Sequence, residues 1–183
     1  MEHKHRLICH PQTPSNGAHS VEVSLRKVNE SLEVTYTIAG LDHVRVPEPR
    51  PPRPAERLWE HTCCEMFVRL SGAFAYHELN FAPSGEWAAY AFEHYRRGAQ
   101  AAIDALDPEV SVRRVPGALE LSARMRLDRL SPAYSNAKLA IALAAVIEDE
   151  DGTLSYWALV HPPGKPDFHH SDAFALKLDE IRN

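Results

Sequence analysis

The sequence has few cysteines, and their arrangement does not suit a disulfide framework. Only Cys9, Cys63 and Cys64 occur among 183 residues. Their number is odd, and a bridge between adjacent cysteines would be strained. We therefore expect reduced thiols, most of them buried in a core.

Long hydrophobic runs are also missing. The longest, residues 139–147, has about half the length that a membrane-spanning helix requires. The first 20 residues are polar apart from residues 7–9, so they lack the hydrophobic segment of a secretory signal peptide. These absences predict a cytoplasmic protein without a membrane partner.

Clustered positive charge is absent as well. The formal net charge is -5, the pI is near 6.1, and the arginines are scattered along the chain. Nucleic acids and anionic membrane surfaces need a basic patch, so neither is an expected partner. An apolar fraction of 44% with 25% charged residues is typical of a soluble globular protein, and the length suits one domain over residues 1–183.

Apolar alternation is the main pattern that the sequence does contain. Residues 21–25 and 32–38 alternate on either side of the Asn29-Glu30 turn, which predicts a β-hairpin. Alternation and turn residues predict further strands near 64–70, 74–81, 86–95, 110–115, 119–127, 138–148, 154–161 and 173–178.

An all-β fold follows from these short strands, and the economical architecture is an antiparallel β-sandwich of jelly-roll type. One or two helical turns are expected near residues 97–106. Residues 46–57 contain five prolines and predict an extended surface loop. Residues 138–147 form a continuous apolar run that a helix or a central strand could host, and its length favours the strand.

Polar side chains interrupt the predicted sheet between residues 58 and 87. Alternation places Cys64 and Met66 on an apolar face and Glu65 on the opposite face. If the next strand pairs with this one, Glu78 and Asn80 share the surface of Glu65. Carboxylates and an amide are suited to a polyhydroxylated ligand.

Two tryptophans bracket this region, and an indole ring can stack on a sugar. We name Trp59, Glu60, Glu65, Glu78, Asn80 and Trp87 as candidate ligand-binding residues. The alternative is structural: Glu65 and Glu78 pair with Arg69, Arg124 or Arg126 on a solvated sheet face, while both tryptophans cap the core.

The loop at residues 161–172 is the second concentration of ionisable groups. Its sequence HPPGKPDFHHSD contains three prolines and a glycine, which restrict its course. Rigid loops of this kind often carry binding residues. It adds the candidate ligand-binding residues Lys165, Asp167, Phe168, His169 and His170.

Four segments resemble one known group of proteins. They are residues 58–60 (LWE), 64–68 (CEMFV), 76–90 (YHELNFAPSGEWAAY) and 166–170 (PDFHH). Together they are similar to DOMON-like bacterial proteins related to family 9 carbohydrate-binding modules, over roughly residues 20–178. The resemblance implies a jelly-roll-like sandwich that binds sugar or haem without catalysis.

The resemblance also implies roles for individual residues. In the sugar-binding modules a tryptophan and a glutamate on the following strand contact the ligand, and Trp59 and Glu65 match them. A second aromatic comes from a late loop, where this chain has Phe168 and no tryptophan. In the haem-binding relatives a methionine and a histidine ligate the iron, which Met66 with His169 or His170 could imitate.

The expected function is thus a non-catalytic module that binds a small ligand, most plausibly a sugar, without a cofactor. Haem binding is one alternative, and an interaction domain without a small ligand, such as a homo-oligomer, is another. A glycoside hydrolase would need two carboxylates at a suitable separation. A metal site would have to draw on His161, His169 and His170.

Overall fold

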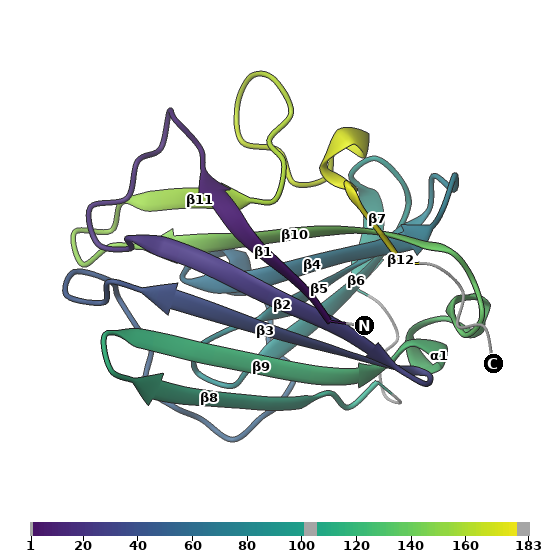
Figure 1. The fold of residues 1–183 in the computed structure, drawn as a ribbon, viewed down its shortest axis with the longest axis horizontal. Helices are drawn as coiled ribbons and strands as arrows, with labels where there is room; N and C mark the ends of the chain where they lie inside the picture. Colours follow the sequence, from purple (N-terminus) through teal and green to yellow (C-terminus); the bar gives the residue numbers. More distant parts are fainter. Residues whose placement is uncertain (1, 101–105, 179–183) are drawn as a thin grey trace.

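The computed structural model of the protein describes residues 2–100 and 106–178 and is built almost entirely from antiparallel strands (Figure 1). In this part of the chain the strands are β1 (Glu2–Cys9), β2 (Ser20–Val28), β3 (Ser31–Ala39), β4 (Cys63–Leu70), β5 (Tyr76–Phe81), β6 (Trp87–His94), β7 (Arg97–Gln100), β8 (Glu109–Val115), β9 (Ala118–Arg126), β10 (Leu139–Glu148), β11 (Leu154–Ala158) and β12 (Leu176–Leu178). The predicted all-β class is confirmed.

Helical structure in the described residues is limited to short turns. These are η1 (Leu58–Glu60), α1 (Leu127–Leu130), η2 (Pro132–Tyr134) and η3 (Ser171–Ala173). None of them is long and apolar enough to cross a lipid bilayer.

The strands form two layers that share one strand. The first layer has the order β1-β2-β3-β9-β8, and the second has the order β7-β6-β5-β4-β10-β11. Strand β1 pairs with β2 through residues 2–7 and with β11 through Ile8 and Cys9, so it belongs to both layers. The expected antiparallel sandwich is therefore confirmed, with β1 joining its sheets along one side.

The core lies between the two layers and follows the period-two pattern. The alternating side chains of β2 and β3, such as Val23 and Tyr36, meet those of β4, such as Cys64 and Met66. All four are at most 2% exposed. A buried contact links the layers, because the Tyr36 hydroxyl donates to the Glu65 carbonyl at 2.7 Å.

A second apolar cluster covers the outer face of the second layer. Phe67 and Tyr76 pack there against alanines of β10, against Phe168 from the loop at residues 161–172 (the late loop), and against Phe174, which follows η3. Strand β10 is consequently covered on both faces, and all ten of its residues are buried. This explains the continuous apolar run at 139–147, where the predicted strand is confirmed.

Most predicted strands are found. Two segments differ from the prediction, one at the N-terminus and one in the middle of the chain. The 20–39 hairpin has β2 and β3 paired from Ser20↔Ala39 to Val28↔Ser31. No strand was expected at β1. The helical turns expected near residues 97–106 are wrong where the structure describes them, because Arg97–Gln100 is strand β7; residues 101–105 lie outside the described residues.

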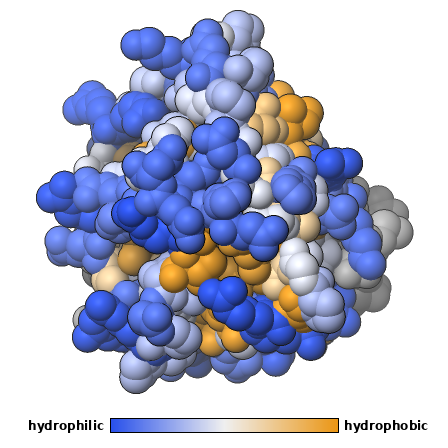
Figure 2. Space-filling view, turned by 90° about the vertical axis from the view of Figure 1, so that its left-hand side faces the viewer, coloured by the Kyte–Doolittle hydropathy of each residue, from blue (hydrophilic) through white to orange (hydrophobic). Residues whose placement is uncertain are grey.

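The proline-rich segment runs beside the start of β6, as expected for an extended loop. The Ala55 amide donates to the Trp87 carbonyl, and the Trp87 amide donates to the Arg53 carbonyl. Pro54, between Arg53 and Ala55, forms a parallel bridge with Trp87. The hydrogen bonds of this bridge come from its two neighbours, so the N–H that proline lacks is not needed. The end of the sandwich seen in Figure 2 is mostly hydrophilic, with an apolar area near its centre.

Candidate functional site

A hollow of about 600 Å³ opens on the outer face of the second layer, beneath the late loop. Its floor is formed by β4 and β5, and its walls by β6, η1, β11 and residues 165–169. This volume falls within the range of about 300–1,000 Å³ that small-molecule sites occupy. The lining residues are Thr13, Trp59, Glu65, Glu78, Tyr90, Phe92, Arg96, Val146, Tyr156, Lys165, Pro166, Phe168 and His169.

Strand register brings the polar residues of β4 and β5 onto the floor. Glu65 lies directly opposite Asn80, and Phe67 lies opposite Glu78, so all four side chains occupy one face. Asn80 donates through Nδ2 to Glu78 Oε1 at 2.9 Å. Its own Oδ1 is buried without a hydrogen-bond partner.

Both floor carboxyl groups are held away from water. Glu65 is 3% exposed and Glu78 is 5% exposed. Burial, together with the neighbouring Glu78, raises the pKa of Glu65 well above its ordinary value. Burial also raises the pKa of Glu78 to about 7, although the hydrogen bond from Asn80 opposes this shift.

His169 reaches the hollow from the late loop and carries no charge near neutral pH. Burial lowers its pKa to about 4, with Arg96 contributing in the same direction. Its Nδ1 lies 2.8 Å from the Tyr76 hydroxyl, and its Nε2 lies 3.7 Å from Glu78 Oε2. The imidazole therefore offers hydrogen bonds to the site instead of a positive charge.

An ion pair closes one side of the hollow. Arg96 follows β6, and its Nη2 donates to Asp167 Oδ1 at 2.9 Å. The Tyr95 hydroxyl donates to Asp167 Oδ2 at 2.8 Å. Although burial opposes it, these two contacts hold the pKa of Asp167 below its ordinary value, so its carboxylate balances the guanidinium. Lys165 is exposed at the rim.

Aromatic rings form much of the wall. Trp59 is 40% exposed and meets Tyr90 edge to face, with 5.5 Å between ring centroids. Phe92, Tyr156 and Phe168 complete the ring-lined surface. Such a wall offers flat apolar faces beside the polar floor, which suits a ligand with both kinds of surface.

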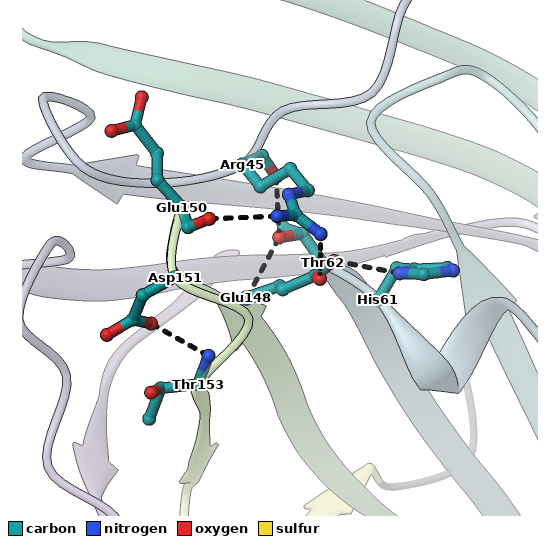
Figure 3. A network of polar contacts seen from close by, with 7 residues as sticks. All are labelled: Arg45, His61, Thr62, Glu148, Glu150, Asp151 and Thr153. Carbon is teal, nitrogen blue, oxygen red and sulfur yellow. Dashed lines mark hydrogen bonds and ion pairs between the residues drawn. The ribbon is translucent and has the colours of Figure 1, made fainter.

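A polar network fixes the short helix that carries Trp59 (Figure 3). Glu148, at the end of β10, accepts from Arg45 Nη1 at 2.6 Å and lies 2.8 Å from His61 Nδ1. Thr62 is buried between these elements: its Oγ1 donates to the Arg45 carbonyl and accepts from the Glu148 amide. The network ties the residues directly after η1 to the sheet, and so positions the indole.

The structure brings together most of the residues proposed from the sequence. Trp59, Glu65, Glu78, Lys165, Phe168 and His169 line the hollow. Asn80 and Asp167 lie behind the lining and orient Glu78 and Arg96 respectively. The structural alternative fails for the carboxylates, because neither Glu65 nor Glu78 pairs with Arg69, Arg124 or Arg126; Arg124 and Arg126 pair with other acids, and Arg69 contacts the Ser171 carbonyl.

Three proposed residues lie elsewhere. Trp87 is 3% exposed within the core between the sheets, because it pairs with Phe81 and shares that inward face. Glu60 is exposed and pairs with Arg57 at 2.6 Å. His170 turns toward Asp172, where its Nδ1 accepts from the Asp172 amide.

Several lining residues were not named from the sequence. Tyr90 and Phe92 could have been found, since they alternate with the inward-facing Trp87 along β6 and pair with Glu78 and Tyr76. Arg96 and Tyr156 carry no such signal. Their positions depend on the turn after β6 and on the pairing of β11 with β10, which sequence periodicity does not encode.

The geometry also bears on the alternative chemistries. Met66 is fully buried between the sheets, on the opposite face from His169, so these residues do not form the haem ligation considered from the sequence. In residues 2–100 and 106–178, no group of three His, Cys, Asp or Glu side chains is placed to hold a metal ion. Cys63 and Cys64 are free and buried, and burial raises the pKa of both thiols.

Comparison with known proteins supports the fold. No family model and no curated protein matches the sequence. A crystal structure of a "putative carbohydrate-binding protein" from Bacteroides uniformis ATCC 8492 is similar, with a TM-score of 0.66 and 14% identity, over 90% of this chain and 82% of that one. This likeness establishes the sandwich architecture.

Two structures of a family 9 carbohydrate-binding module from Caldicellulosiruptor kristjanssonii, with glucose and with cellotriose, are more distant. Each has a TM-score of 0.49, with 12% and 13% identity; they cover 82% of this chain and 71% and 69% of theirs. At this score the likeness supports no conclusion. None of the three structures is described as a DOMON protein, so that part of the resemblance stays a prediction.

Proposed function

We propose that the protein binds a carbohydrate in the hollow over β4, β5 and β6, without catalysing a reaction. The observation that carries this proposal is the composition of the hollow. Buried polar groups with unused hydrogen-bonding capacity form the floor, and aromatic rings form the wall. A sugar presents hydroxyl groups and apolar ring faces, so it complements both surfaces.

Two further observations support a sugar over other hydroxylated ligands. The indole of Trp59 is partly exposed beside the hollow instead of being packed in the core, so part of the ring is accessible for stacking. In addition, the protein from Bacteroides uniformis that shares this fold is described as carbohydrate-binding.

The proposal predicts a separation between binding and stability. Trp59→Ala removes the stacking surface and should weaken sugar binding by about tenfold or more, the effect expected for a central aromatic contact. Because η1 contains no buried residue, the free energy of unfolding should change by less than about 1 kcal/mol. Titration calorimetry against a panel of mono- and disaccharides, with denaturant unfolding, measures both quantities.

Glu60→Gln is the matched control. Glu60 is adjacent to Trp59 in sequence, but it does not line the hollow and pairs with Arg57. We expect this variant to bind as the unmodified protein does. If no sugar in the panel binds, or if Trp59→Ala binds as well as Glu60→Gln, the proposed function is wrong.

A further inference from the structure

Glu65 and Glu78 differ from every other buried acid that the structure describes. Glu86 pairs with Arg50 and Arg53, and Glu148 pairs with Arg45 and lies beside His61. Asp149 accepts from the Asn16 amide and the Ser15 hydroxyl. Each of these acids thus has a donor that offsets its burial.

The floor acids have less compensation than these. Among the described residues, the Glu65 carboxyl has no hydrogen bond and no ion pair, although it is 97% removed from solvent. Glu78 accepts from the Asn80 amide and lies near the uncharged His169. Burying a carboxyl group without a donor or cation is costly, and acids whose pKa is raised in this way cluster at functional sites.

We propose that the sugar bound in this hollow is an amino sugar, whose protonated amine lies between Glu65 and Glu78. The inference rests on the proposed function and specifies its ligand class. An ammonium group supplies what the floor lacks, namely a positive charge with three N–H donors. Glu65 and Glu78, which both line the hollow, are the matching acceptors.

The aromatic wall of the hollow also suits an ammonium group. Trp59, Tyr90 and Phe92 surround the floor with aromatic faces, which attract cations through their ring quadrupoles. This attraction is stronger where the cation is desolvated than at an exposed site. The ring and hydroxyl groups of the sugar would then extend from the floor toward Trp59 and the rim.

The other ionisable groups around the hollow leave the floor as its most acidic part. The charges of Arg96 and Asp167 offset each other, and His169 is neutral. Lys165 is exposed at the rim, where water screens its charge. Tyr76, Tyr90 and the buried Cys63 remain protonated, because burial raises the pKa of each, and Tyr156 lines the wall.

Binding of an ammonium group should release protons from the protein. Burial raises the pKa of both floor carboxyls, so in the free protein they retain protons at pH values where exposed glutamates are ionised. A cation between them favours the ionised forms. Affinity for an amino sugar should therefore rise with pH, approaching about tenfold per pH unit for each proton released.

The experiment compares four probes by titration calorimetry: glucosamine, N-acetylglucosamine, glucose and cyclohexylamine. At pH 7 we expect glucosamine to bind about tenfold or more tightly than glucose and N-acetylglucosamine, which carry no positive charge. Between pH 5.5 and 7 its affinity should increase. Repeating the titration in buffers of different ionisation enthalpy should reveal proton release for glucosamine but not for glucose or N-acetylglucosamine.

Glu65→Gln tests the role of the floor directly, because glutamine keeps the shape of the side chain but cannot ionise. The ratio of glucosamine to glucose affinity should fall toward one, and proton release should decrease. Glu78→Gln should act in the same direction and serves as the second variant if Glu65→Gln does not fold, as judged by thermal melting. Glu60→Gln should keep the full preference.

The outcomes separate this inference from the proposed function. If glucose and N-acetylglucosamine bind as tightly as glucosamine, the inference is overturned and sugar binding stands. If cyclohexylamine binds as tightly as glucosamine, the site recognises amines in general and the amino sugar is overturned. If none of the sugars in this comparison or in the wider panel binds, the proposed function fails together with the inference.

Discussion

Glu78 shows how one buried side chain couples folding to pH. Its pKa in the folded protein is about 7, compared with an ordinary value of 4.5. The folded state therefore holds this proton more tightly than the unfolded chain does. The stability that Glu78 contributes is fully present below pH 4.5 and is lost as the pH rises through 7.

Glu78→Gln should remove this dependence. Glutamine resembles the protonated acid and can still accept from Asn80. The variant should gain stability relative to the unmodified protein as the pH rises from 4.5 to 8, by on the order of 3 kcal/mol. Denaturant unfolding at several pH values measures this difference.

His169 should affect the dependence of stability on pH in the opposite direction from Glu78, so variants of the two residues can be told apart. Its pKa is lowered to about 4, so its contribution to stability is lost as the pH falls from its ordinary value of 6.5 through 4. His169→Gln should therefore gain relative stability on acidification. A constant difference between Glu78→Gln and the unmodified protein across the range would contradict the buried, raised-pKa state of Glu78.

Individual residues of the site could be predicted only where alternation fixes their direction. The period of two placed Glu65, Glu78 and Asn80 on one surface, and the strand register agrees. The same rule applied to β6 directs Trp87 inward and Tyr90 outward, whereas the ability of an indole to stack on a sugar favoured Trp87 as a binding residue. Residue type is thus a weaker guide than position along a strand.

At the scale of elements, the network around Glu148 holds η1 against the sheet. Thr62→Val keeps the side-chain shape but leaves the Arg45 carbonyl and the Glu148 amide without their partner. Thr62 is 1% exposed, so we expect a loss of about 1–3 kcal/mol in the free energy of unfolding. Acrylamide quenching of tryptophan emission should also increase as η1 loosens around Trp59.

Thr37→Val provides the control, because Thr37 lies on the outer face of β3 between the inward-facing Tyr36 and Ile38. Its stability should change by less than about 0.5 kcal/mol. If the two variants are equally stable, the contacts of Thr62 do not hold this part of the structure.

Elements with strong alternation were predictable, and the two that lack it were not. Strand β1 begins with the charged and polar residues 2–6, which read as a solvated tail. It becomes a strand because β2 offers it a pairing edge. Strand β7 is similar: Arg97–Gln100 contains no apolar alternation, and the turn after β6 directs it back along that strand. Both depend on tertiary pairing that local sequence does not reveal.

For the whole molecule, the sheet order predicts a gradient of local stability. Strands β4 and β10 are central, and their residues are almost all buried. Strands β7 and β8 end the two layers, and β8 has no buried residue. Amide hydrogen exchange should be slowest in β4 and β10 and fastest in β7 and β8. Exchange at equal rates in β8 and β10 would contradict this order.

The shared strand β1 also limits how the sandwich can open. Backbone hydrogen bonds run from one layer to the other through β1, so the two layers are joined along this side of the sandwich. Separation of the layers must then begin at the far margin, where β7 and β8 end them. The hollow lies on the outer face of the second layer and reaches β6, the strand that pairs with β7, so opening at that margin would affect this side of the hollow before the side next to β11.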